Sequence, residues 1–177
     1  MLREETRRQR YLKKSELATK MPVYFVTINF DFDENLAFLI RTAGCFGVSK
    51  VFVIGSVPPP SKLRAKSGSL LDFVDLEPFS NPRDFIDYCR QNDINIVSAE
   101  LCNESNNIYD YEFDFSKKTA IVLGHESIGV PADILAHSDI VYIPMPGPGY
   151  CLNTSQTGTA IIMEFNRQYH LNSSCLV

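Results

Sequence analysis

Four polar residues stand after apolar, β-branched runs that are typical of buried strands: Asn35, Arg41, Glu126 and Asn153. Ligands of open α/β sheets bind at the carboxyl ends of the strands, so these side chains are candidates for one shared site. In such a site an arginine binds an anion, while a carboxylate and amides hydrogen-bond to a polar ligand. The sequence has no metal-ligand spacing of the zinc type, so we expect no metal there.

Arg41 has the most informative local surroundings. On a helix, residues three and four positions away share its face, and here they are small or apolar: Ala37, Phe38, Gly44 and Cys45. No carboxylate of its own helix can therefore pair with it. Arg41 either binds an anion in the site, or its guanidinium reaches water or a carboxylate elsewhere in the fold.

Glu126 and Asn35 also have ordinary structural interpretations. Glu126 lies between Gly124 and Gly129, so a backbone turn carries its carboxylate into the crevice, although a glutamate in a turn is more often solvated. Asn35 is a candidate N-cap of the helix that follows, and the local sequence favours this interpretation. His125 is a candidate base, but a lone histidine is more often structural.

The loop at 144–149 holds three prolines and two glycines between an apolar run and a helix. Proline fixes φ and glycine permits backbone angles closed to other residues, so the loop keeps one shape at an entropic cost. Such a loop after a buried strand is typical of a ligand site. A local alternative is that Asn153 caps the following helix, with Gln156 completing a capping box. Cys151 is either a nucleophile or, more commonly for a free cysteine, a small apolar residue.

The composition is that of one globular domain with a sizeable core: 177 residues, of which 45% are apolar and 21% charged. Five cysteines without paired spacings argue against a disulfide framework and favour a reducing compartment. No apolar run approaches the length of a membrane span, and the N-terminus lacks the apolar centre of a signal peptide. We therefore expect a cytoplasmic protein without a membrane segment.

The charge of residues 1–20 differs from that of the rest. They carry seven Arg or Lys against three Glu, a net +4, which leaves −8 on residues 21–177. We therefore divide the chain into a basic arm, 1–20, and a domain, 21–177. The arm is either a solvated helix end, which is the commoner case, or an electrostatic contact for phosphate. In the second case the contacting residues are Arg7, Arg8, Arg10, Lys13 and Lys14.

Short apolar runs alternate with helical patterns along the chain. The apolar runs predict strands at 23–28, 50–54, 94–99, 119–123 and 140–143. The helical patterns lie at 36–46, 61–70, 82–92, 131–137 and 155–169. This alternation predicts an α/β fold with a mostly parallel sheet flanked by helices.

Three segments of the chain resemble the motifs of the SpoU, or TrmH, family of SPOUT RNA methyltransferases. They lie in order at 35–43 with 46–47, at 121–126 with Gly129, and at 143–145 with 151–155. Each segment is modest alone, but their order and spacing make the joint match specific. The resemblance covers residues 22–170.

The resemblance implies an α/β fold with a C-terminal trefoil knot, a homodimer, and S-adenosylmethionine as cofactor. The implied reaction is methylation of a ribose 2′-hydroxyl in tRNA or rRNA. By motif match, the cofactor pocket includes Gly124, Ile143, Leu152 and Cys151, and the polar active-site set is Asn35, Arg41, Glu126 and Asn153. Because a guanidinium stays protonated, we expect Arg41 to stabilise charge and hold phosphate or ribose. The apolar residues at 160–165 further predict a dimer interface.

The chain departs from the family at Cys151, where serine is common. A thiol is a weaker hydrogen-bonding group than a hydroxyl, so the departure bears on catalytic efficiency more than on the fold. Two other classes of function stay open. One is a SPOUT-like protein that binds cofactor or RNA with weak or no turnover. The other is an unrelated doubly wound enzyme acting on a nucleotide or metabolite, although no glycine-rich dinucleotide or Walker motif follows a strand.

Overall fold

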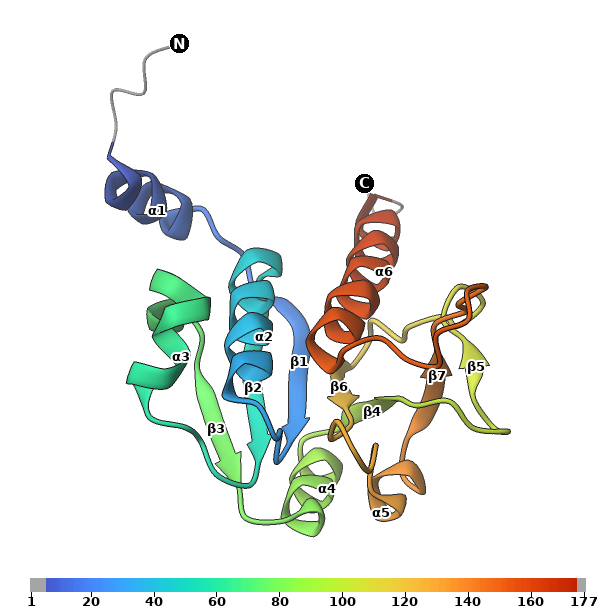
Figure 1. The fold of residues 1–177 in the computed structure, drawn as a ribbon. Coiled ribbons are helices and arrows are strands. Elements are labelled where there is room, and N and C mark those ends of the chain that lie inside the picture. Colours follow the sequence, from blue (N-terminus) through green and yellow to red (C-terminus); the bar gives the residue numbers. More distant parts are fainter. Residues whose placement is uncertain (1–5, 175–177) are drawn as a thin grey trace.

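The structure is a computed structural model that describes residues 6–174. Its strands are β1 (Met21–Ile28), β2 (Val48–Ile54), β3 (Leu76–Phe79), β4 (Ile94–Ala99), β5 (Asn106–Asn107), β6 (Lys118–Leu123) and β7 (Asp139–Tyr142). Its helices are α1 (Arg7–Glu16), α2 (Asp33–Phe46), α3 (Pro60–Ser67), the 3₁₀ helix η1 (Gly68–Phe73), α4 (Pro82–Gln91), α5 (Ala132–Leu135) and α6 (Thr154–Ser174). Strands and helices alternate along most of the chain (Figure 1).

The seven strands form one parallel sheet in the order β3-β2-β1-β6-β4-β7-β5. β4 pairs with β6 on one side and with β7 on the other. The carboxyl ends of these three strands therefore lie side by side, although β4 and β7 are far apart in sequence. The loops that follow these three strands therefore meet at the carboxyl-terminal end of the sheet.

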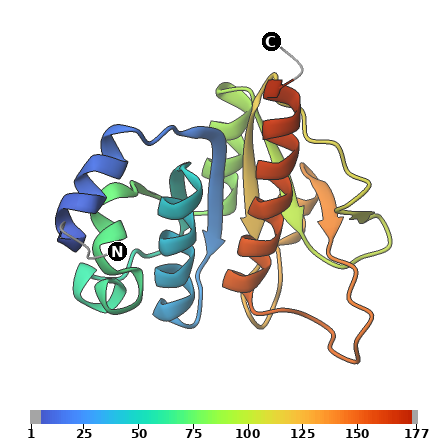
Figure 2. The ribbon, with the colours of Figure 1, turned by 90° about the horizontal axis from the view of Figure 1, so that it is seen from above.

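Helices cover both faces of the sheet (Figures 1 and 2). α2, α3 and α6 pack on one face, and α4 and α5 pack on the other. The side chains of β1 alternate between the two cores: Val23 and Phe25 join the first, and Tyr24 and Val26 join the second. Because both faces are buried, the sequence of the strand is a continuous apolar run.

The predicted α/β class with a mostly parallel sheet is confirmed, and each of the five predicted strands is present. Two further strands were not predicted: β3, which is only partly buried, and β5, which has two residues. The helix expected at 61–70 ends at Ser67. Gly68 has a positive φ of 64°, and the chain continues from there as the 3₁₀ helix η1. A glycine in this conformation ends an α-helix readily because it has no Cβ.

The longest helix, α6, has 21 residues. It buries Ile161, Ile162 and Phe165 completely in the core and leaves Met163 exposed. The apolar residues at 160–165 therefore pack mainly in the core of this chain, and most of the apolar surface that predicted an interface there is already buried. Among residues 6–174, no helix combines the length and apolar character that crossing a bilayer requires.

Candidate functional site

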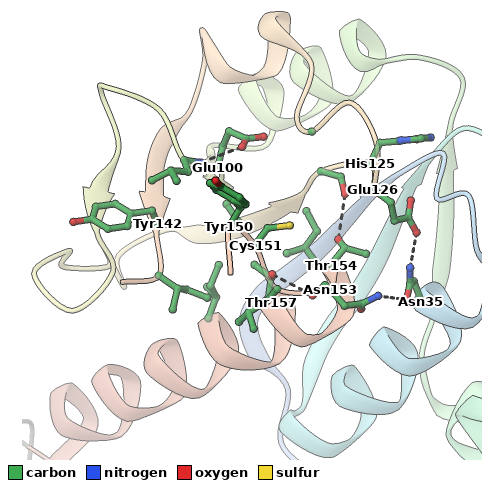
Figure 3. A pocket seen from close by; sticks show the side chains of 18 of the residues that line it. Asn35, Glu100, His125, Glu126, Tyr142, Tyr150, Cys151, Asn153, Thr154 and Thr157 are labelled. Carbon is green, nitrogen blue, oxygen red and sulfur yellow. Dashed lines mark hydrogen bonds between the residues drawn. The ribbon is translucent and has the colours of Figure 1, made fainter. Parts of the chain in front are cut away.

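A cavity of about 540 Å³ opens at the carboxyl ends of β4, β6 and β7 (Figure 3). The start of α2 and the start of α6 complete its walls. Its volume falls in the range of small-molecule and cofactor sites. Of the eight residues that the motif match assigns to the cofactor pocket or the active site, all but Arg41 line the cavity. The seven lining residues are Asn35, Gly124, Glu126, Ile143, Cys151, Leu152 and Asn153.

Three polar side chains form a continuous chain of hydrogen bonds at one end of the cavity (Figure 3). Asn153 Nδ2 donates to Asn35 Oδ1 at 2.9 Å, and Asn35 Nδ2 donates to Glu126 Oε1 at 2.5 Å. The second oxygen of Glu126 accepts from the backbone N–H of Asp31 at 2.9 Å. The three residues come from α2, the turn after β6 and the segment before α6. The structure thus brings together residues that lie 91 and 118 positions apart.

The carboxylate fixes the orientation of both amides. An ionised Glu126 can only accept, so the nitrogen of Asn35 must face it and the oxygen of Asn35 must face Asn153. Each amide nitrogen carries two N–H groups, and these bonds use one of the two. Asn35 and Asn153 both line the cavity, and each has one N–H group that these two bonds leave unused.

The expectation that Asn35 is the N-cap of its helix is wrong. α2 begins at Asp33, its N-cap is Phe32 without a side-chain cap bond, and Asn35 lies within the first turn. Asn35 is 95% buried, with an exposed fraction of 5%. A buried amide requires partners, and the partners that it finds are tertiary ones, Glu126 and Asn153.

Asn153 caps the start of α6 and also belongs to the hydrogen-bond chain in the cavity wall. Its Oδ1 accepts from the backbone N–H of Ser155 at 2.9 Å, which satisfies an otherwise unpaired group at the start of α6. Its Nδ2 donates to Asn35. The helix cap therefore holds the amide in the orientation that the hydrogen-bond chain requires.

The turn after β6 depends on two glycines. The backbone groups of His125 and Gly129 bond to each other at 3.0 and 2.9 Å, and Gly129 has a φ of +70°. A Cβ added to Gly124 would lie 2.7 Å from the carbonyl carbon of Gly129, which is closer than real contacts allow. Thr154 of α6 donates to the carbonyl of Gly124 at 3.1 Å. This wall of the cavity is thus made by closely approaching backbone.

His125 is held by two contacts. The backbone N–H of Ser127 donates to Nδ1 at 3.1 Å, so Nε2 carries the proton of the neutral ring and faces Asp31 Oδ1 at 3.3 Å. Asp31, His125 and Glu126 have ligand atoms within 4.8 Å of one another, the spacing of a metal site. A metal ion on Nε2 requires the other tautomer, which cannot accept from Ser127. The cluster is therefore hydrogen-bonded as it stands.

Arg41 lies outside the cavity. Its side chain is exposed on α2, and its Nη1 is 3.4 Å from the carbonyl oxygen of Lys66 in α3. Arg41 follows Asn35 by six positions, or about one and two-thirds helical turns, so the two side chains leave α2 on different faces. Within one chain, the structure does not bring Arg41 to the other three polar residues.

Cys151 lies at the cavity, as Figure 3 shows, and its side chain is exposed. It is not the small buried apolar residue that a free cysteine commonly is. Cys89 in α4 is the contrasting case, because burial raises the pKa of its thiol to about 12. Tyr150 beside Cys151 is 91% exposed, so this part of the loop faces solvent.

Glu100 is a cavity residue that the sequence analysis did not select. It directly follows β4 and lines the cavity between the loops after β6 and β7. The signal was present, since the rule that strand ends carry site residues applies to β4 as it does to β1, β6 and β7. What the sequence could not give is that β4 lies between β6 and β7 in the sheet.

Within the basic arm, residues 7–16 form the helix α1, which lies apart from the sheet (Figure 1). α1 begins after Thr6, which forms a capping box with Gln9. Arg10, Lys13 and Lys14 are exposed on it. The side chains of two predicted RNA contacts lie outside the described residues: Arg7 and Arg8.

The chain is similar to known proteins in sequence and in fold. A model of the SpoU rRNA Methylase family matches residues 22–163. The tRNA (guanosine(18)-2′-O)-methyltransferase TARBP1 of Mus musculus is 29% identical over 140 residues, which are 76% of this chain and 9% of that protein. The tRNA (guanosine(18)-2′-O)-methyltransferase of Escherichia coli K12 is 28% identical over 139 residues, which are 76% of this chain and 58% of that enzyme. The chain thus spans less than two thirds of these two relatives.

Among solved structures, the TrmH/SpoU tRNA modifying enzyme of A. aeolicus superposes with a TM-score of 0.81. The match covers 94% of this chain and 85% of that chain at 24% sequence identity. At this identity the likeness establishes the fold.

Proposed function

Because the chain belongs to the SpoU rRNA methylase family, we propose that it is an S-adenosylmethionine-dependent RNA 2′-O-ribose methyltransferase. The observation that carries the proposal is the hydrogen-bond chain from Asn153 through Asn35 to Glu126 at the wall of a cofactor-sized cavity. We name the part of the cavity lined by Asn35, Glu126 and Asn153 the acceptor end. The part lined by Gly124, Ile143 and Leu152 is the cofactor end.

The residues of the cofactor end fit a nucleoside-containing cofactor. Gly124 and Gly129 bring backbone groups to the cavity surface because neither has a Cβ, and Ile143 and Leu152 supply apolar surface. We assign the cofactor to Gly124, Ile143, Leu152 and Cys151. When bound, S-adenosylmethionine supplies a methyl group on a positively charged sulfur.

The acceptor end has the groups that methyl transfer to a hydroxyl requires. The ribose hydroxyl must be held in line with the methyl group, and its oxygen must be stabilised while it loses a proton. The unused N–H groups of Asn35 and Asn153 are donors to that oxygen. Glu126 positions both amides and reduces their freedom to rotate, so the donors are oriented before the substrate arrives.

We assign to Arg41 the stabilisation of charge at the phosphate or ribose, as the motif match implies. Because Arg41 is outside the cavity of its own chain, this role requires a second copy, and the proposal therefore includes a homodimer. Two large apolar side chains are exposed on the neighbouring helices α2 and α6: Phe38 at 43% and Met163 at 57%. Thr42 and Thr159 join these two helices by a 3.0 Å hydrogen bond, so the helices pack side by side. Light scattering that finds only monomers at micromolar concentration would refute the proposed homodimer.

The substrate that we propose is tRNA or rRNA, with the basic arm at 1–20 adding contacts to phosphate. Arg10, Lys13 and Lys14 are exposed on α1. The domain at 21–177 carries a net −8 and repels a polyanion at long range, so a local basic element offsets this repulsion. We also extend to this chain the trefoil knot that the family resemblance implies, and a cytoplasmic location.

The experiment that tests the reaction is mass spectrometry of modified nucleosides in tRNA and rRNA from cells with and without the gene. We expect one 2′-O-methylated nucleoside to be lost with the gene and restored by the purified protein with S-adenosylmethionine. A complete and unchanged set of nucleosides would refute the activity. Calorimetry with S-adenosylhomocysteine tests the cofactor separately.

A protein that binds the cofactor or RNA with weak or no turnover is the second candidate. Two observations favour it: Cys151 replaces the hydroxyl residue common in the family, and Arg41 is absent from the cavity of its own chain. Binding of S-adenosylhomocysteine by a protein that methylates no cellular RNA would support this second function.

A further inference from the structure

Glu100 is a half-buried carboxylate in the cavity wall for which the proposed reaction gives no role. Figure 3 shows it on the side of the cavity away from Asn35. Its Oε1 accepts from the backbone N–H of Leu101 at 3.0 Å, and its Oε2 accepts from the backbone N–H of Val130 at 3.0 Å. The carboxylate therefore ties the end of β4 to the turn after β6.

The position of Glu100 is set by the sheet. β4 lies between β6 and β7, and the cofactor end is built from the residues that follow those two strands. The backbone N–H of Glu100 also donates to the carbonyl of Val141 in β7 at 3.1 Å. Gly129 packs so closely that a Cβ there would lie 2.4 Å from Glu100 Oε2. Glu100 is thus held from both sides at the cofactor end.

The hydrogen bonds of Glu100 are incomplete. A carboxylate has about four lone-pair sites, and the two backbone donors use two of them. Among residues 6–174, no Lys, Arg or His forms an ion pair with it. A partly buried carboxylate without a cation gains from further neutral donors, and it repels phosphate and other anions. A ribose with two free hydroxyls supplies such donors, and a carboxylate at a strand end is a known way to bind them.

We propose that Glu100 binds the two ribose hydroxyls of the cofactor and so selects a nucleoside whose ribose carries no phosphate. The proposal rests on the proposed function, since it concerns the same cavity. It places the adenosine half of the cofactor beside β4, with the sulfur and its methyl group toward the acceptor end. The positively charged amino group of the cofactor is the competing partner for Glu100, and the experiment separates the two.

The experiment compares three ligands by calorimetry on the full chain: S-adenosylhomocysteine, its 2′,3′-dideoxy analogue, and 5′-methylthioadenosine, which lacks the amino group. Wild type, Glu100→Gln and Glu100→Ala are measured. Glu104→Gln is the matched control, because it removes the same charge from the exposed loop that follows β4. Thermal melting of each variant reports on folding.

We expect Glu100→Gln to weaken S-adenosylhomocysteine and 5′-methylthioadenosine alike, by roughly ten- to hundredfold, since a hydrogen bond to a charged group is lost. The dideoxy analogue should bind wild type as weakly as it binds the variant. Glu104→Gln should change none of the affinities. Glu100→Ala should repeat the pattern with a larger loss of melting temperature, because the two backbone donors lose their acceptor.

Three results would overturn the proposal. An equal loss for all three ligands shows that Glu100 only supports the turn. A loss for S-adenosylhomocysteine and its dideoxy analogue, with 5′-methylthioadenosine unchanged, shows that the carboxylate meets the amino group. Unchanged affinities show that it meets neither. In these cases wild type still binds the cofactor and methylates RNA, whereas a wild type that binds no ligand refutes the proposed function together with this role.

Discussion

The two ends of the cavity are built from different parts of the chain. At the acceptor end, the side chains of Asn35, Glu126 and Asn153 bond to one another. At the cofactor end, Gly124 and Gly129 bring two backbone segments into contact. Removing a functional group from a side chain should damage the acceptor end. Adding a side-chain atom to a glycine should damage the cofactor end, because the two backbone segments already touch. Substitutions at the acceptor end should therefore lower turnover more than cofactor affinity, and substitutions at the cofactor end should lower cofactor affinity more than turnover.

Arg41→Ala tests whether a residue outside the cavity belongs to the acceptor end. We expect a loss in turnover of a hundredfold or more with cofactor affinity nearly unchanged, because one electrostatic stabiliser of the reacting oxygen is removed. Arg83→Ala, an exposed arginine on α4 across the sheet, is the matched control. Activity within about threefold of wild type would refute the role of Arg41.

Mixing subunits shows whether Arg41 acts across a dimer. Arg41→Ala and Asn35→Ala chains are each expected to be inactive. If Arg41 serves the cavity of its partner, a heterodimer of the two has one complete site and regains activity. If both residues serve the same chain, the mixture stays inactive.

Glu126→Gln should lower turnover by roughly ten- to hundredfold and leave cofactor affinity within about threefold. Glutamine offers one acceptor oxygen to two donors, the backbone N–H of Asp31 and the amide of Asn35, so one of them is left unpaired. Glu34→Gln in the first turn of α2 is the control, since its side chain is exposed. An equal loss in affinity and turnover would show that the two ends are not separate.

Gly124→Ala should lower cofactor affinity more than turnover, the reverse of the result expected for Glu126→Gln. The new methyl group meets the backbone of Gly129 at 2.7 Å, so the turn must move, and we expect roughly a tenfold loss of cofactor affinity from about 1–3 kcal/mol of overpacking. Gly147→Ala is the control because no atom lies within 4 Å of its added Cβ. Calorimetry with S-adenosylhomocysteine measures both variants. Full affinity in Gly124→Ala would show that backbone approach is not what forms the cofactor end.

The arm should affect neither end of the cavity. Replacing Arg10, Lys13 and Lys14 with glutamine should weaken RNA binding several-fold and flatten the plot of log affinity against log salt. Each lost phosphate contact changes the slope by somewhat under one unit, and cofactor affinity stays the same. Arg83→Gln combined with Arg90→Gln serves as a control of similar charge. An unchanged slope would identify α1 as a solvated helix only.

Cys151→Ser should have the smallest effect, because the hydroxyl restores the group common in the family and no bond depends on the thiol in the reaction proposed here. We expect unchanged or raised turnover, by no more than about threefold. Loss of all turnover in the serine variant would instead identify Cys151 as a nucleophile. One kinetic comparison at saturating cofactor separates these outcomes.

The strands at 23–28 and 119–123 were predictable because apolar, β-branched runs buried on both faces have a local signature. The short strands β3 and β5 lack it, since β3 contains a proline and a glutamate and β5 is a pair of asparagines. The apolar residues of α6 were identified from the sequence, but most of them pack in the core of this chain and not in the predicted interface. Whether such a residue packs in its own core or in an interface depends on neighbouring helices, which the pattern does not specify.

The sequence by itself determined the five long strands, most of the helices, the glycine turn and the proline loop, because these depend on the residues' own backbone preferences. The tertiary structure decided which side chains meet. In the folded chain, Asn35 hydrogen-bonds to Glu126 and does not cap its own helix. Arg41 contacts the carbonyl of Lys66, and Glu100 hydrogen-bonds to the turn after β6. Contacts between residues about 100 positions apart depend on strand order and helix rotation, and neither is written in a local pattern.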